Sequence, residues 1–213
     1  MSKIQIMPVI FGRTVLPESM AFQNGDKDKV RDIVFQVFIV KSEKKLIMID
    51  AGCETMRGFV MRDFIGTVQA LENANISPDE ITDILITHAH HDHIECIKYF
   101  KNAVIHIQED EYESGKRFFT DELKVNTFKD EYNVCENIKL VKIGGHSVGS
   151  CVVELEDDDT TYVISGDECY LRDCIEKNIP TGCSVNLEKS KYFIQKYSGK
   201  EYTVLLCHEE IIL

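Results

Sequence analysis

The chain has 213 residues, of which 44% are hydrophobic, and its 24 basic and 36 acidic side chains give a net charge of −12. This size and composition predict one domain over residues 1–213 with a substantial core. The negative charge disfavours nucleic acid or an acidic membrane surface as a partner. Because the opening residues lack the hydrophobic core of a signal peptide and no apolar run is long enough to span a bilayer, we expect a cytoplasmic protein.

The first half of the chain predicts strands separated by helices. The strand-like runs cover 4–11, 33–40, 46–49 and 84–87. The third run ends in MIDAGC, where Asp50 and Gly52 predict a tight turn. Apolar residues at helical spacing predict an amphipathic helix over 57–73. Ser77 and Glu80 form a capping box, which predicts the start of a second helix.

The second half repeats this pattern. The predicted strands cover 103–108, 138–143, 151–155, 161–165 and 202–207, and the predicted helices cover 109–119 and 187–197. Because strands outnumber helices, we expect sheets covered by outer helices. Polar motifs follow several of these strands, namely GGHS at 144–147, SGD at 165–167 and CHE at 207–209.

The segment ITHAHHDHIEC, at 86–96, holds four of the seven histidines. His88 and His90 are separated by one residue, so in an extended segment both side chains point to the same side. Asp92 and His93 follow closely enough to serve a second ion if the chain turns into a helix there. Imidazole and carboxylate are ordinary zinc ligands, so we favour a metal site over a solvated polar turn.

Two ions need more ligands than this segment supplies. His146, Asp167 and His208 each follow a predicted strand, and we expect them to converge with the cluster on one sheet edge. His106 lies inside a predicted strand and is expected to be structural. The eight cysteines contain no C-x-x-C pair, and we expect reduced thiols that are mostly buried, including Cys169 and Cys207.

The motifs THAHHDH at 87–93, GGHSVGS at 144–150, SGD at 165–167 and CHE at 207–209 resemble those of the metallo-β-lactamase superfamily in kind and order. The resemblance extends from Met48 to His208. It implies an α/β (α+β) fold, the four-layer αββα sandwich, with a dimetal site at one edge of the two sheets. It also implies that Asp50 orients ligand histidines. The implied ligands are His88, His90 and His146 for one ion, Asp92, His93 and His208 for the other, and Asp167 as the bridge.

Within the superfamily, GHSVG and Tyr170, three residues after Asp167, resemble the N-acyl homoserine lactonases. In those enzymes the tyrosine faces the substrate carbonyl, whereas the alternative for Tyr170 is a core aromatic. His91 stands where lactonases usually carry an apolar residue, and Glu95-Cys96 replaces a pair of small residues. We therefore expect pocket walls that differ from those of the lactonases around the same metal chemistry.

The sequence thus predicts a dinuclear metal-dependent hydrolase that cleaves a lactone or ester-like bond of a small molecule with a metal-activated hydroxide. Asp92 or Asp167 would pass a proton to the leaving group, and Tyr170 would stabilise the oxyanion. Zinc is the expected metal, although iron and manganese suit the same ligands. The alternatives are a thioesterase of the glyoxalase II type, which normally carries a further C-terminal helical region, and a non-catalytic metal-binding sensor.

Overall fold

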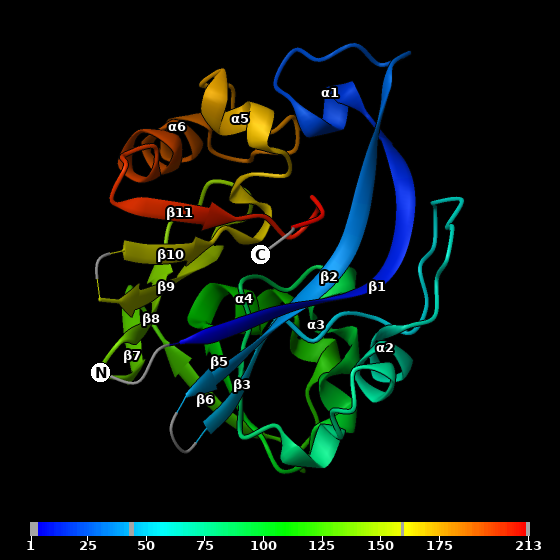
Figure 1. Ribbon diagram of the computed structural model, residues 1–213, viewed down its shortest axis with the longest axis vertical. Helices are drawn as coiled ribbons and strands as arrows, with labels where there is room; N and C mark the ends of the chain where they lie inside the picture. Colours follow the sequence, from blue (N-terminus) through cyan, green and yellow to red (C-terminus); the bar gives the residue numbers. More distant parts are fainter. Residues whose placement is uncertain (1–3, 43–44, 159, 212–213) are drawn as a thin grey trace.

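The computed structural model describes residues 4–42, 45–158 and 160–211. Its strands form two sheets that face each other, with helices on their outer sides (Figure 1). The first sheet has the order β1 (Gln5–Pro17), β2 (Val30–Ser42), β3 (Lys45–Ile49), β4 (Asp83–Leu85), β5 (Val104–Gln108) and β6 (Lys124–Phe128). The second has the order β11 (Tyr202–Leu205), β10 (Thr160–Ile164), β9 (Cys151–Asp157), β8 (Ile138–Lys142) and β7 (Glu131–Cys135).

Strands β3 to β6 are parallel, whereas β1, β2 and β3 pair antiparallel. In the second sheet only β10 and β11 are parallel. Strand β2 pairs with β3 only from Phe38 to Ser42, so its residues 30–37 pair with β1 alone. This outer half of the hairpin is a two-stranded ribbon that extends beyond the sheet (Figure 1). The ends of β4, β10 and β11 lead into the histidine and aspartate motifs.

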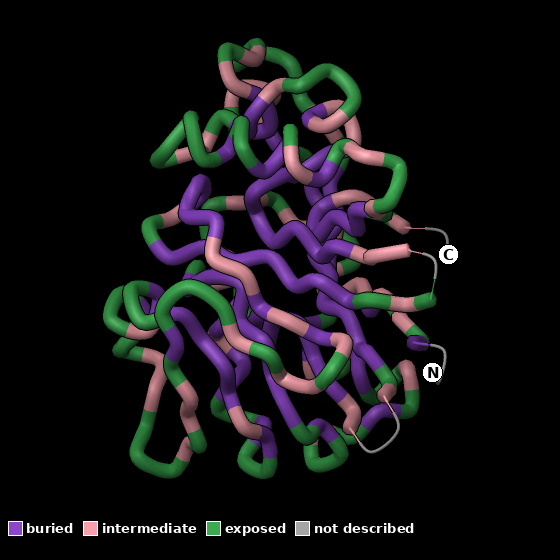
Figure 2. Tube along the Cα trace, turned by 90° about the vertical axis from the view of Figure 1, so that its left-hand side faces the viewer, coloured by how far each residue is buried: buried purple, intermediate pink, exposed green. Residues whose placement is uncertain are grey.

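The central strands are buried on both faces (Figure 2). Phe38 and Val40 of β2 belong to the core between the sheets, while Val37 and Ile39 belong to the core under the helices. Strand β9 divides in the same way, with Val153 directed between the sheets. Side chains alternate along a strand, so a strand covered on both faces is a continuous apolar run. The predicted αββα sandwich is confirmed.

The longer helices cover the two outer faces. The helices are α1 (Glu18–Ala21), α2 (Thr67–Asn73), α3 (His91–Ile94), α4 (Glu109–Ser114), α5 (Arg172–Glu176) and α6 (Leu187–Tyr197). Helix α6 has the predicted bounds and lies with α5 beside β11, while α2 and α3 lie near the first sheet (Figure 1). None of the helices in the described part of the chain has the length and hydropathy that crossing a bilayer requires.

The predicted helix over 57–73 is wrong for its first ten residues, since α2 begins at Thr67. Gly58 and Gly66 have φ angles of 87° and 80°, which a right-handed helix does not contain. The apolar residues that suggested a helix serve another purpose, because Phe59 and Phe64 pack their rings on the β1–β2 hairpin. The apolar residues at helical spacing therefore belong to a loop that covers the hairpin, not to a helix.

Other boundaries differ in smaller ways. The capping box at Ser77 and Glu80 is present, but it starts a single 3-10 turn, Pro78–Glu80. The helix predicted over 109–119 ends at Ser114 and continues as a separate 3-10 turn, Lys116–Phe118. Strands β6 and β7 were not predicted, because both lie at sheet edges and carry many polar residues.

A buried polar cluster joins the strands of the first sheet away from the histidine motif. His106 Nε2 lies 3.0 Å from Asp83 Oδ1, and Lys45 Nζ donates to the same oxygen at 2.9 Å. The His106 ring also stacks on Tyr132, with 5.0 Å between centroids. Burial opposes ionisation, but hydrogen bonds from His106, Lys45 and Thr82 lower the pKa of Asp83 to about 2.

We expect Asp83→Asn to reduce the free energy of unfolding by about 1–2 kcal/mol at pH 7. Because the folded pKa of Asp83 lies below its unfolded value, its contribution is complete above about pH 5 and disappears as the pH falls toward 2. Urea unfolding of both proteins at pH 7 and pH 3 measures this difference. A gap between wild type and variant that is equally large at both pH values would contradict the role of the Asp83 charge.

Candidate metal centre

The seven predicted ligands lie close together in two groups, at the ends of strands of both sheets. Each comes from a segment that follows a strand or begins a short helix there. His88 and His90 follow β4, and Asp92 and His93 lie on α3. The remaining three come from the second sheet, with His146 after β8, Asp167 in a 3-10 turn after β10 and His208 after β11. The predicted convergence on one edge is therefore present in the fold.

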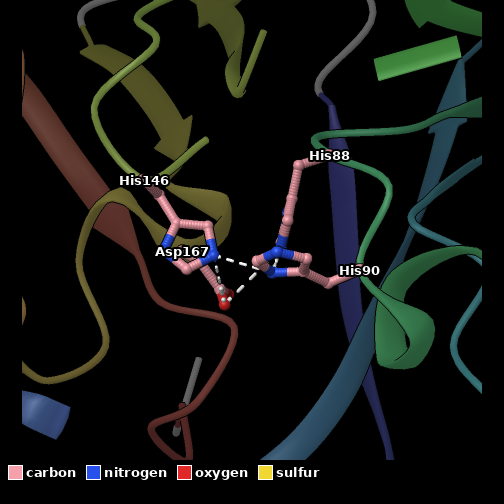
Figure 3. Close-up of side chains that lie close together, drawn as sticks. All are labelled: His88, His90, His146 and Asp167. Atoms are coloured by element: carbon pink, nitrogen blue, oxygen red, sulfur yellow. Dashed lines mark hydrogen bonds and ion pairs between the residues drawn. The ribbon is translucent and has the colours of Figure 1, made fainter. Parts of the chain in front are cut away.

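The first group contains His88, His90, His146 and Asp167, whose side chains point toward one another (Figure 3). His90 Nδ1 lies 3.0 Å from His88 Nε2 and 2.9 Å from His146 Nε2. Asp167 Oδ2 lies 3.6 Å from His88 Nε2 and 3.4 Å from His146 Nε2. Three ring nitrogens and one carboxylate oxygen therefore surround a common point.

The second group contains Asp92, His93 and His208. The Nε2 atoms of His93 and His208 lie 3.1 and 3.0 Å from Asp167 Oδ1. Asp92 Oδ2 lies 3.5 Å from His93 Nε2 and 4.0 Å from His208 Nε2. Asp167 therefore presents one carboxylate oxygen to each group.

The donor atoms fit divalent cations. Burial lowers the pKa of His88 well below its usual value and that of His146 to about 4, so both rings are neutral and offer lone pairs. Burial also disfavours charged His93 and His208, but attraction to Asp167 prevails and raises the pKa of both. His93 Nε2 is buried without a hydrogen-bond partner in the described part of the chain. Nitrogen and carboxylate donors that face one another in this way are a cation-binding set.

Buried hydrogen bonds fix which nitrogen of each ring faces the site. Asp50 Oδ2 accepts a hydrogen bond from His93 Nδ1 at 2.7 Å, which leaves Nε2 toward the ligands. Thr87 donates its backbone N–H and its hydroxyl to Asp50, so that hydroxyl accepts from His88 Nδ1 at 3.1 Å. Asp50 thus orients a ligand ring directly, as the resemblance implied.

The ring of His208 is oriented by the hairpin. Its Nδ1 donates to the backbone carbonyl of Val34 on β2 at 3.0 Å, so that Nε2 faces Asp167. The ring also packs edge-on against Phe35 at 5.2 Å between centroids. The hairpin therefore positions one ligand of the second group.

Two buried glutamates that were not predicted hold the ligand loops. Glu111 on α4 accepts hydrogen bonds from the backbone N–H of Ala89 at 2.8 Å through one oxygen. Its other oxygen accepts from Ser147 Oγ at 2.6 Å and Gly149 N at 2.8 Å. It therefore ties the first histidine loop to the loop that carries His146.

Glu168 acts on the same loop from the other side. One of its oxygens accepts from the backbone N–H groups of Gly145 and His146 and from the Ser150 hydroxyl. Burial raises the pKa of Glu168 to about 7. A Cβ at Gly145 would lie 2.2 Å from the other carboxylate oxygen, so only glycine fits beside this carboxyl group.

These two glutamates could not be selected from the sequence alone. Glu111 stands in EDEYES among other acidic residues, where a solvated helix surface was the natural interpretation. No local pattern in the sequence distinguishes Glu111 from its acidic neighbours. Glu168 was adjacent to Asp167 but outside the motif that was recognised.

Tyr170 lies between the two ligand groups and is 6% exposed. Its ring centroid is 5.1 Å from that of His208 and 6.0 Å from that of His146. Burial raises the pKa of Tyr170 well above its usual value, so the hydroxyl remains protonated. Its position suits a hydrogen-bond donor to substrate as well as a packed aromatic. Cys169 and Cys207 are buried free thiols, as predicted.

A cavity of about 840 Å³ opens onto both ligand groups and is lined by Tyr170. Its apolar wall comes from the hairpin and the loop after β3, and consists of Leu16, Met20, Ile33, Phe35, Met56 and Phe59. This volume lies within the range of small-molecule binding sites.

The family model of the metallo-beta-lactamase superfamily matches residues 31–188. The chain belongs to this superfamily. A probable metallo-hydrolase of Methanocaldococcus jannaschii is 30% identical over 168 residues, which cover 78% of this chain and 72% of that protein. An N-acyl homoserine lactonase of Bacillus thuringiensis is 22% identical over 202 residues, which cover 84% of this chain and 80% of the lactonase.

Solved structures show the same fold. An N-acyl homoserine lactone hydrolase with bound N-hexanoyl-L-homoserine superimposes with a TM-score of 0.83 at 19% identity, over 98% of this chain and 94% of that chain. AidC, a dizinc quorum-quenching lactonase, gives a TM-score of 0.77 at 16% identity, over 96% and 87% of the two chains. The predicted superfamily is confirmed, and the metal assignment of each ligand stays a prediction.

We expect Glu111→Ala to weaken metal binding by about tenfold to a hundredfold, because the two ligand loops lose their shared acceptor. Glu111→Gln should have an intermediate effect, since the amide retains one acceptor oxygen. Competition with a chromophoric chelator measures the affinity. Glu113→Ala is the control, because Glu113 is an exposed residue of the same helix.

Thermal unfolding of the metal-free variants separates positioning from general stability. A Glu111→Ala protein that melts earlier but binds metal as tightly as the wild type would limit Glu111 to a structural role.

Proposed function

We propose that the protein is a dinuclear metal-dependent hydrolase that cleaves a lactone or another ester-like bond of a small molecule. The observation that carries the proposal is the position of Asp167, which presents Oδ2 to one group of nitrogens and Oδ1 to the other. Attraction to the surrounding histidines outweighs burial and lowers the pKa of Asp167 well below its usual value, so the carboxylate is ionised. An ionised carboxylate between two sets of imidazoles suits a pair of cations.

The relatives support the same class of reaction. They include N-acyl homoserine lactonases and a probable metallo-hydrolase, which agrees with the prediction of an enzyme. A sensor that had only retained the fold would not require all seven ligand positions, yet the chain has all seven. We propose zinc as the metal because the donors are imidazole nitrogens and carboxylate oxygens, which also suit iron and manganese.

When bound, two divalent ions would supply hydroxide at neutral pH and polarise the substrate carbonyl. The chain's own residues would complete the reaction. Tyr170, protonated and beside both ligand groups, would donate a hydrogen bond to the developing oxyanion. Asp92 has the more accessible carboxylate, with 16% of its side chain exposed against 6% for Asp167. We therefore favour Asp92 over Asp167 for passing a proton to the leaving alkoxide.

Purified protein should bind about two divalent ions per chain, and Asp167→Asn should lower occupancy at both positions. The substitution removes the negative charge between the two groups of donors, so repulsion between the cations is no longer offset. Metal analysis by mass spectrometry measures both quantities. One ion or none at saturating metal would contradict the assignment of Asp92, His93 and His208.

The activity is tested with a panel of lactones, thioesters and phosphodiesters, each with and without a chelator. Hydrolysis of lactones that the chelator abolishes supports the proposal. Preferential hydrolysis of thioesters would favour an enzyme of the glyoxalase II type instead. If the protein binds two ions but hydrolyses none of the esters, the non-catalytic metal-binding sensor is the remaining hypothesis.

Tyr170→Phe should lower lactone turnover by about tenfold to a hundredfold, because a neutral donor to the oxyanion contributes roughly 1–3 kcal/mol. Metal content should remain unchanged, since the phenol is not among the ligands. Tyr192→Phe, at an exposed tyrosine of α6, is the control. If Tyr170→Phe hydrolyses lactones as fast as the wild type, the hydroxyl has no role in catalysis. Tyr170 would then serve only as a packed aromatic, since phenylalanine preserves the ring.

A further inference from the structure

Two of the six arginines differ from the others in their polar contacts within the described part of the chain. Arg13, Arg31 and Arg62 form ion pairs with carboxylates, and Arg172 donates to the backbone carbonyl of Val204. By contrast, the guanidinium groups of Arg57 and Arg117 have no hydrogen bond or ion pair with any residue that the structure describes. Both side chains are exposed, so their guanidinium groups are available to a ligand.

Both arginines line one cavity beside the metal centre. This second cavity has a volume of about 500 Å³, and Asp92 belongs to its wall. Met56, Phe59, Asp92 and Arg117 line the second cavity and the larger one alike. A substrate at the metal centre can therefore extend from the larger cavity toward both guanidinium groups.

The acidic side chains nearby do not neutralise these arginines. Asp110, in the wall of the larger cavity, pairs with Lys142 at 2.7 Å, and Glu113 pairs with Lys116 at 3.2 Å. Both oxygens of Glu111 already accept hydrogen bonds from the ligand loops. Asp92 is the one carboxylate in the wall of the second cavity, and it faces His93 and His208.

The segments that carry the arginines are held in place by His91, the residue that departs from the lactonase pattern. Its Nε2 donates to the backbone carbonyl of Thr55 at 2.7 Å, two residues before Arg57. Its ring lies 6.1 Å from that of Phe118, and Arg117 lies over the same phenylalanine, 4.7 Å from the centroid. Stacking on an aromatic face leaves the N–H donors of a guanidinium free.

We propose that Arg57 and Arg117 form an anion-binding subsite that holds a carboxylate or phosphate group of the substrate while its ester bond lies at the metal centre. Guanidinium groups bind both anions through paired, charge-assisted hydrogen bonds. The inference rests on the proposed function and narrows its substrates to anionic lactones or esters. The apolar wall of the larger cavity then faces the remainder of the molecule.

A matched pair of γ-lactones tests the subsite, one with an apolar side chain and the other with the same side chain ending in a carboxylate. Wild-type enzyme should prefer the carboxylated lactone at least about tenfold in kcat/KM, mainly through KM. Arg57→Gln and Arg117→Gln should each remove most of this preference. Lys27→Gln is the control, because it removes the same charge from an exposed residue that lines neither cavity.

Binding of inorganic phosphate to the metal-loaded protein gives a measurement that needs no turnover. The NMR signals of the Arg57 and Arg117 side-chain N–H groups should shift on titration, and each Arg→Gln substitution should raise the dissociation constant about tenfold. Phosphate binding that neither substitution weakens would overturn the subsite, because the anion would then be held by the metals.

The two experiments also separate the source of the anion. Arginine-dependent phosphate binding with equal kcat/KM for the two lactones would overturn the assignment to the substrate and identify a free anion as the ligand. Because phosphate binding is independent of hydrolysis, a protein that cleaves none of the esters would contradict the proposed function without deciding the subsite. The phosphate titration decides it in that case.

Discussion

The buried carboxylate of Asp50 is the contact on which the metal-binding edge depends. It accepts hydrogen bonds from the backbone and the hydroxyl of Thr87 and from the ring of His93. One side chain therefore joins the end of β3, the end of β4 and the first turn of α3. Loss of this acceptor would leave three buried donors unpaired, each at a cost of about 1–3 kcal/mol. The histidine motif can be buried at the sheet edge because Asp50 accepts hydrogen bonds from these donors.

The ring nitrogens of the two ligand groups, unlike the donors around Asp50, lack enough protein partners of their own in the part of the chain that the structure describes. His90 Nδ1 lies within hydrogen-bond distance of His88 Nε2 and of His146 Nε2, while His93 Nε2 is buried without a hydrogen-bond partner among the described residues. Burial of such groups disfavours the folded chain, and a cation removes the penalty. Binding of a cation at these donors would therefore stabilise the folded chain. Glu111 and Glu168 hold the ligand loops together through their buried hydrogen bonds.

Much of the fold and of the site followed from the sequence because the signals were local. The continuous apolar runs of β2, β3 and β9 reflect burial on both faces, and H-x-H-x-D-H holds four potential ligands in six residues. The remaining features depend on contacts between distant segments. Phe59 and Phe64 had helical spacing but pack on the hairpin, and Glu111 became recognisable only when α4 was placed against both ligand loops.

The same distinction applies to the charges. Arg57 in a loop and Arg117 in a 3-10 turn lie 60 residues apart in the sequence, and nothing in the sequence alone indicates that they act together. Their joint presence in one cavity wall is a property of the folded chain. His91 was visible as a departure, and its contacts with Thr55 and Phe118 show that it supports the walls beside the metal centre.

In the outer half of the β1–β2 hairpin, the residues that shape the cavity are distinct from those that form the core between the sheets. Leu16, Ile33 and Phe35 line the cavity from a ribbon whose residues 30–37 pair only with β1, whereas the sheet-to-sheet core begins at Phe38. Substitutions on the ribbon can reshape the space offered to a substrate while the strands that carry most of the ligands stay as they are. Replacing the side chain of Val34 would keep the orientation of His208, because the contact is made by the backbone carbonyl of Val34. Selectivity can therefore diversify at Leu16 and Ile33 with little effect on the ligands, whereas Phe35 also packs on the ring of His208.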